Sequence, residues 1–256
     1  TGEFVKTKSE LSYQANELRQ RFGEDLSSPI DVYSVMQSQE RLTLIFYPFS
    51  NRISGMCVRM HAGDQLIAIN STRTLGRQRF TAAHELYHLF VQSEITSVIC
   101  GNDIGNNSDD EERNADAFAS FFLAPNDALR SFIKNHLLKG ISRPLRLEDV
   151  VRIEQYFKMS RQATLYRLVG DDFISLEFAN TIKMNIIPSA RKYGFSDELY
   201  IPTPIERQHF TTGSYIDLAE RLGNSDLISN GKYEEILLDA FRADIVYNLE
   251  TQEIYD

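Results

Sequence analysis

The segment Phe80 to Val91, FTAAHELYHLFV, places two histidines four residues apart, with a glutamate directly after the first. On a helix, residues i and i+4 lie one above the other, so His84 and His88 present their imidazoles to a common point. Two imidazole nitrogens can hold a zinc ion, and Glu85, about 100° further round the axis, can take a proton from an attacking water. The spacing therefore predicts a metal site with a general base, the chemistry of the H-E-x-x-H motif.

The alternative is a buried helix whose two histidines are satisfied by hydrogen bonds. In a chain of this composition, a chance H-E-x-x-H match is an event on the order of one in a hundred. The match also falls within Thr74 to Gln92, where apolar residues recur at helical spacing. We therefore favour the metal site, which still requires a third protein ligand.

A second acidic segment, Asp109 to Pro125 (DDEERNADAFASFFLAP), is the expected source of that ligand. Interpreted as a helix that ends before Pro125, it puts Glu112 and Asp116 on one stripe beside small alanines. Glu112 is the predicted third ligand, with Glu111 as its rival, and Asp116 is predicted to hold the far nitrogen of a ligand histidine. The alternative is that these acids only favour the positive end of a helix dipole.

The elements that must position these helices are a helical start and a small sheet. Apolar spacing predicts helices over Ser9–Phe22 and 29–39. Three segments rich in β-forming residues predict a small twisted sheet with a hairpin, and they are Leu42–Phe49, Ile53–Met60 and Gln65–Asn70. The fold class is therefore α+β, with the two ligand helices after the sheet and a mostly helical C-terminal extension. We expect residues 1–170 to form the metal-binding domain and 171–256 the extension.

A helix-turn-helix outline is predicted at about 145–168, with short helices over 147–157 and 161–168 and Ser160 as an N-cap. This region is basic, so its second helix could enter a DNA groove. The apolar residues of that helix also have a packing explanation, which argues against DNA as a partner. Beyond residue 170, we expect a helix broken near Pro188, an extended IPTPIERQ segment, and two helices over 217–222 and 233–243.

The composition narrows the class of protein further. The net charge is -9, from 27 basic against 36 acidic side chains, which disfavours nucleic-acid binding through the overall field. Two cysteines cannot form a disulfide framework, and the first thirty residues lack the pattern of a signal peptide, so we expect a cytoplasmic protein. No apolar run approaches the roughly 20 residues of a membrane span, so no membrane association is expected.

Two runs together, IAINSTRTLGRQRFTAAHELYHLF and ERNADAFASFFLAP, resemble the ImmA/IrrE family of zinc metallopeptidases. Members share a strand ending in I-N-S, a helix with F-T-x-A-H-E-x-x-H, and a helix with E-x-x-A-N-x-F-A-x-x-L-L-M-P. The resemblance covers about 29–168, and GSYIDLAERL and KYEEILLDAFRADIVY also resemble full-length members. It implies a minimal zincin-like core that holds Zn²⁺ on His84, His88 and Glu112, with Glu85 as general base.

The resemblance also implies a function. Family members are cytoplasmic regulators of mobile elements and stress responses, and several act on a helix-turn-helix repressor. A zinc-dependent endopeptidase with such a protein substrate is therefore the expected function. The sequence departs from the family pattern at Tyr87, Asp116 and Ala124, where glycine, asparagine and methionine are frequent. The alternatives are a zinc-containing module that binds and sequesters a partner, and a DNA-binding regulator.

Two features of such an enzyme are less well defined by the sequence. Peptide hydrolysis needs a donor for the negative charge of its transition state, and His61, His209 and Arg242 are open candidates. Uncontrolled cytoplasmic proteolysis would be toxic, so we also expect a gate. The irregular stretch Ser97 to Asn107 lies between the two ligand helices and is a candidate flap.

Overall fold

A computed structural model describes residues 6–60, 62–92, 97–101, 104, 109–225 and 227–247. In these ranges, the centre of the molecule is a mixed sheet of five strands in the order β4-β2-β3-β1-β5. Strand β1 (Leu42–Tyr47) pairs in parallel with β3 (Gln65–Asn70) and antiparallel with β5 (Phe210–Gly213). Strand β2 (Gly55–Arg59) pairs antiparallel with both β3 and β4 (Ser97–Cys100), so β4 and β5 form the two edges.

The α+β class, the three expected strands and the β2–β3 hairpin are confirmed, but the predicted width of the sheet is wrong. Strands β4 and β5 have four residues each, too few for an alternating pattern to identify them. Their partners also lie far away in the sequence. The division at residue 170 stays a prediction, and β5, from beyond that position, lies against β1.

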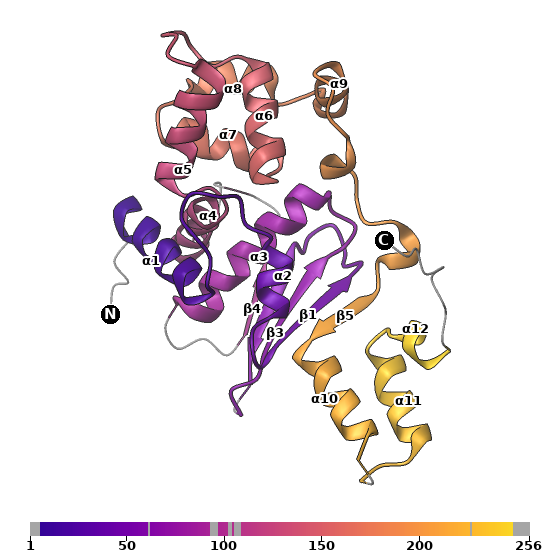
Figure 1. Ribbon diagram of the computed structural model, residues 1–256. Helices are drawn as coiled ribbons and strands as arrows, with labels where there is room; N and C mark the ends of the chain where they lie inside the picture. Colours follow the sequence, from indigo (N-terminus) through magenta and orange to yellow (C-terminus); the bar gives the residue numbers. More distant parts are fainter. Residues whose placement is uncertain are drawn as a thin grey trace.

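The two helices that carry the predicted site lie on one face of this sheet (Figure 1). Helix α3 (Leu75–Phe90) packs on β2 and β3, and α4 (Asp110–Leu123) packs on α3. Helix α1 (Lys8–Arg21) covers α4, and α2 (Val32–Gln37) covers the start of the sheet. The second helix begins three residues after Pro29, so the start predicted for it is wrong.

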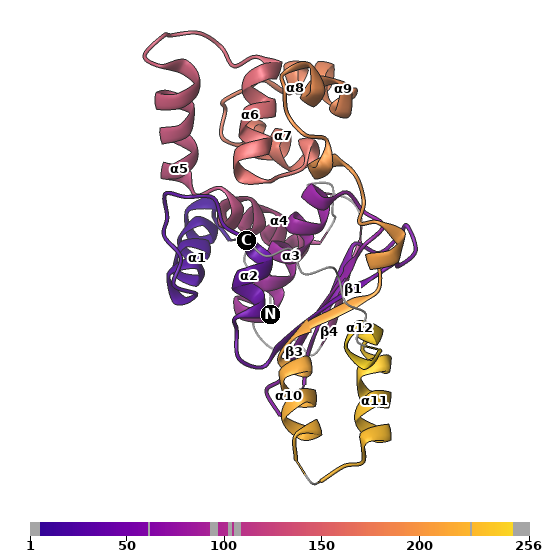
Figure 2. The same cartoon turned by 45° about the vertical axis from the view of Figure 1, so that its right-hand side comes forward.

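The rest of the chain is mostly helical, as predicted. Figures 1 and 2 show α5 to α9 at one end of the molecule and α10 to α12 at the other, with the sheet between them. The elements are α5 (Asn126–Ser131), a π-helix η1 (Phe132–Leu138), α6 (Leu147–Phe157), α7 (Arg161–Gly170), α8 (Leu176–Ile182), α9 (Ile186–Lys192), the 3-10 turns η2 (Glu198–Tyr200) and η3 (Ile205–Arg207), α10 (Ser214–Gly223), α11 (Asn230–Asp239) and α12 (Ala243–Val246). None of the helices in the described ranges combines the length and apolar character needed to cross a bilayer.

Helices α6 and α7 have the predicted helix-turn-helix outline, with Lys158 in the left-handed region and the Ser160 side chain capping α7. Two basic residues of α7, Arg161 and Arg167, are only 1 % and 3 % exposed. Arg161 pairs with the buried Glu154, so neither of the two arginines of this helix can reach a DNA surface.

Of two expectations for the segment after α7, the break in the helical region near Pro188 is confirmed, and the extended segment is wrong in part. The helical region breaks at 183–185, where Asn185 has a φ of 56°, and Pro188 lies in the first turn of α9. Proline is tolerated in a first turn because its missing N–H has no partner there. The segment predicted to be extended contains the 3-10 turn η3.

Candidate metal centre

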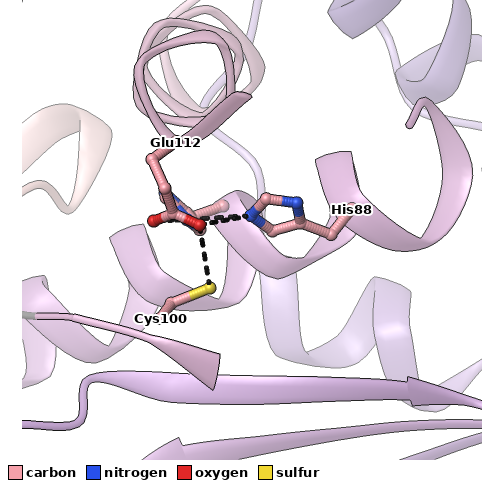
Figure 3. Close-up of side chains that lie close together, drawn as sticks. His88, Cys100 and Glu112 are labelled. Atoms are coloured by element: carbon pink, nitrogen blue, oxygen red, sulfur yellow. Dashed lines mark hydrogen bonds and ion pairs between the residues drawn. The ribbon is translucent and has the colours of Figure 1, made fainter. Parts of the chain in front are cut away.

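His84, His88 and Glu112 converge where α3 faces α4. The Nε2 atoms of the two histidines lie 3.2 Å apart. One carboxylate oxygen of Glu112 is 3.4 Å from Nε2 of His84, and the other is 3.4 Å from Nε2 of His88. Figure 3 shows Glu112 extending from its helix towards His88. These three side chains thus direct their donor atoms to one point, as the sequence predicted.

The spacing of these donors fits a metal ion. With metal–nitrogen and metal–oxygen bonds of about 2.0–2.2 Å, donors at the corners of a tetrahedron are separated by about 3.3–3.5 Å. The separations of 3.2 and 3.4 Å match that value. Two neutral imidazole nitrogens and a carboxylate are also a ligand set that suits zinc. The residues therefore fit a metal ion held by two imidazole nitrogens and one carboxylate.

The rival ligand, Glu111, lies elsewhere. Its carboxylate accepts a hydrogen bond of 2.6 Å from the hydroxyl of Tyr87, which links α4 to α3. Consecutive helical residues differ by about 100° in direction, so only one of two neighbouring glutamates can face the histidines. That residue is Glu112 in this structure.

Each histidine is oriented by a second side chain. Nδ1 of His84 lies 3.0 Å from Oδ1 of the buried Asp116, and Nδ1 of His88 lies 2.6 Å from Oε1 of Gln92. Such partners fix the ring and its tautomer, so that Nε2 is free to bind a cation. Asp116 was predicted for this position, whereas Gln92 was not, because an amide beside a histidine carries little signal in a sequence.

The electrostatics of the cluster favour a cation. Burial acts to lower the pKa of His84, but the hydrogen bonds with Asp116 and Glu112 outweigh burial and raise the pKa to about 10. Burial likewise acts to raise the pKa of Glu112, and its hydrogen bonds with the two histidines hold it well below the ordinary value instead. The raised pKa of His84 shows that the surrounding carboxylates stabilise positive charge at this point, and the lowered pKa of Glu112 keeps it as a carboxylate.

Glu85 lies between α3 and the sheet, and its side chain is completely buried. Neither carboxylate oxygen accepts from an N–H or O–H group among the described residues, and the thiols of Cys57 and Cys100 lie beside it. Burial raises the pKa of this carboxyl group, and the neighbouring His84 and His88 partly oppose that effect. A buried carboxylate without such a donor is costly in a purely structural role and is suited to exchange a proton with a bound water.

A glycine on β2 makes room for this carboxylate. A Cβ at Gly55 would lie 2.6 Å from Cγ2 of Thr81 and 2.9 Å from Oε1 of Glu85. Both distances are shorter than real contacts, so α3 can approach the sheet this closely only because the position has no side chain. Gly55 therefore allows the Glu85 side chain to lie directly against β2.

The loop before α3 is fixed by Asn70, the asparagine of the I-N-S motif. Its side-chain amide donates to the backbone carbonyls of Phe49, Ser50 and Ile53 over 2.7 to 3.2 Å. Its side-chain oxygen accepts from the backbone of Thr72 at 3.1 Å. The motif thus holds the end of β3 at the point where the chain turns into the helix of the histidines.

Besides Gln92, two further residues at the site were missed by sequence reasoning. The Cys100 sulfur belongs to the same group of donors, all of which lie within 4.8 Å of one another. Arg77, two turns before His84, lines a small pocket beside it together with Cys100 and Asp116. The i+7 spacing of Arg77 and His84 was a usable signal. Cys100 had none, because its position depends on strand pairing.

The other candidates lie elsewhere or outside the described residues. His209 packs against the rings of Tyr47 and Phe241, and Arg242 pairs with Asp244, so these side chains are occupied in the C-terminal part. His61 lies outside the described residues. Of the candidate flap, residues 97–100 form a strand, which corrects the expectation of irregular structure there, and most of 102–107 lies outside the described residues.

Comparison with known proteins agrees with this geometry. Residues 44–169, from β1 to the end of α7, match the family model of the IrrE N-terminal-like domain. The matched region includes the α3 and α4 helices and the strand that carries Cys100. No curated protein matches the chain. The chain therefore carries the IrrE N-terminal-like domain of the Peptidase_M78 family, as the resemblance of its two motifs indicated.

Proposed function

We propose that this protein is a zinc-dependent endopeptidase that hydrolyses a peptide bond in a protein substrate. The observation that carries the proposal is the meeting of two imidazole nitrogens and a carboxylate at tetrahedral separations, beside a buried carboxylate that lacks a well-aligned donor. The peptidase-family domain supports the same chemistry.

The role of each residue in the proposed reaction follows from the position of its side chain. Zinc, when bound, supplies a Lewis acid for the scissile carbonyl and lowers the pKa of a water to near 7. Glu85 accepts the proton of the attacking water and passes it to the leaving amine. Asp116 and Gln92 keep the two histidine rings in place during these steps.

Arg77 is the group that we propose as the donor for the negative charge of the transition state. It lies on the same helix as His84, and its guanidinium donates to Ser54 at 3.4 Å and to Gln162 at 3.3 Å. The guanidinium lines the small pocket beside His84, where the oxygen of a scissile carbonyl would have to lie. A positioned cation of this kind stabilises charge that develops during the reaction.

The proposed substrate is a helix-turn-helix repressor or a similar regulator of a mobile element or stress response, and the proposed compartment is the cytoplasm. Support for both comes from the family to which the matched domain belongs. A second candidate function is a zinc-containing module that binds and sequesters such a partner. It is favoured by the small size of the pocket beside His84, about 10 Å³, which admits about one water molecule and no peptide.

The test uses Glu85→Gln, with Glu111→Gln as the matched control on the neighbouring helix. Each purified variant is incubated with repressors encoded near the gene, and intact and cleaved repressor are measured by mass spectrometry. We expect Glu85→Gln to retain its metal and to lose cleavage, whereas the control cleaves at the wild-type rate. Cleavage by Glu85→Gln at the wild-type rate would remove Glu85 from the mechanism. Binding of an intact repressor by wild type and by both variants would favour the sequestering module.

A further inference from the structure

A fourth donor lies at the proposed metal centre. Cys100 is the last residue of β4, and its sulfur is 3.8 Å from Oε1 of Glu112. Figure 3 shows the thiol beneath Glu112, on the side of the sheet. With metal–sulfur and metal–oxygen bonds of about 2.3 and 2.1 Å, these donors of a tetrahedral site are separated by about 3.6 Å. The sulfur is thus near the separation expected from the Glu112 oxygen, and it lies within 4.8 Å of the other donors.

The position of this thiol is set by the sheet. Cys100 is the cross-strand partner of Gly55, and its carbonyl accepts a hydrogen bond of 3.0 Å from the backbone of Ser54. The Ser54 hydroxyl also donates to the carbonyl of Gly101 at 2.6 Å. Paired residues on neighbouring strands place their side chains on the same face, so the Cys100 thiol faces α3. Gly55, its partner on β2, has no side chain and so leaves room beside the thiol on this face.

We propose that Cys100 is a fourth ligand of the metal, and that in this conformation it closes the centre and keeps the peptidase latent. The inference rests on the proposed zinc site. Catalytic zinc sites have three protein ligands and one open position, whereas sites with four protein ligands are closed. A thiolate, a carboxylate and two neutral imidazoles also balance the charge of Zn²⁺, as a buried site requires. Withdrawal of the end of β4 would open the position that the reaction needs.

Two further observations support a closed centre. The carboxylate of Glu85 is fully buried, and the Cys100 thiol lies beside it, where the water of the reaction would have to bind. The pocket beside His84, with Cys100 in its wall, has room for about one water molecule. A pocket of this size does not hold a peptide.

The test uses cobalt(II) in place of zinc in the full chain, because cobalt reports on its ligands by absorption. One equivalent is added to metal-free wild type, Cys100→Ser and Cys57→Ser. Cys57 is the matched control, since it lies two residues from Gly55 on β2 and is also buried. We expect a thiolate-to-cobalt charge-transfer band in wild type and Cys57→Ser, and its loss in Cys100→Ser with cobalt still bound.

Acetohydroxamate then probes the open position, because it binds only where a coordination site is free. We expect it to change the cobalt spectrum of Cys100→Ser and to leave that of wild type unchanged. If wild type binds one cobalt but shows no charge-transfer band, Cys100 is not a ligand, whereas the metal centre itself stands. An equal response of both proteins to acetohydroxamate would overturn the closure. Failure of every protein to bind cobalt would overturn the metal centre itself, and this inference with it.

Discussion

The substitution Asp116→Asn tests whether the carboxylate behind His84 tunes the metal centre. Oδ1 of Asp116 lies 3.0 Å from Nδ1 of His84, and the residue is only 2 % exposed, so solvent screens this contact weakly. The amide keeps the shape and an acceptor oxygen but removes the charge that makes the histidine a stronger ligand. Loss of such a partner lowers metal affinity about 10- to 100-fold, or about 1.4 to 2.7 kcal/mol.

The assay is competition with a fluorescent zinc chelator, with thermal unfolding as a second measurement. The stabilisation conferred by saturating zinc should fall by the same free energy, which corresponds to about 3 to 10 °C in Tm for a chain of this size. Asp110→Asn is the matched control, because Asp110 is on the same helix and pairs with Arg113 at the surface. Zinc affinity of Asp116→Asn within about twofold of wild type, or an equal loss in the control, would refute the proposed role.

Three further predictions concern the surroundings of the site. Gly55→Ala should lower the free energy of unfolding by about 1–3 kcal/mol through overpacking against α3, and a denaturant midpoint equal to that of wild type would contradict this. Arg161→Ala leaves the buried Glu154 without its cation and should lower the free energy of unfolding by about 3–5 kcal/mol. An unchanged denaturant midpoint would contradict this prediction. Burial acts to raise the pKa of Asp149, but hydrogen bonds from an arginine and a backbone amide lower it. The contribution of the Asp149 carboxylate to the free energy of unfolding is therefore present above the ordinary carboxyl pKa and is lost as pH falls below about 4. When denaturant midpoints are compared in that range, wild type should lose more stability than Asp149→Asn.

The parts of the site that follow helical periodicity could be predicted from the sequence. His84 and His88 are one turn apart on α3, and Glu112 and Asp116 are one turn apart on α4, so each pair shares a helix face wherever the helix lies. That the two faces meet was suggested by the small alanines of α4. The choice between Glu111 and Glu112 was open, because helix boundaries inferred from sequence are uncertain by more than the single residue that separates them.

The parts that depend on strand pairing could not be predicted. Cys100 reaches the centre only because Ser97–Cys100 pairs with β2, about forty residues earlier in the chain. Strand β5 reaches β1 across an even longer separation. Four-residue strands have too few side chains for a period, and the sequence contains no mark of their partners. Gly55 was placed within a predicted strand, but its role as a space for Glu85 follows only from the packing of α3 on the sheet.

The metal content of the purified full chain tests the proposed centre most directly. Zinc per chain is measured by elemental mass spectrometry in wild type, Glu112→Gln and Glu111→Gln. We expect about one zinc in wild type and in Glu111→Gln, and a marked loss in Glu112→Gln, because only Glu112 lies 3.4 Å from both histidine nitrogens. Absence of zinc from all three proteins, even after zinc is supplied, would contradict the metal centre and the hydrolytic function proposed for it.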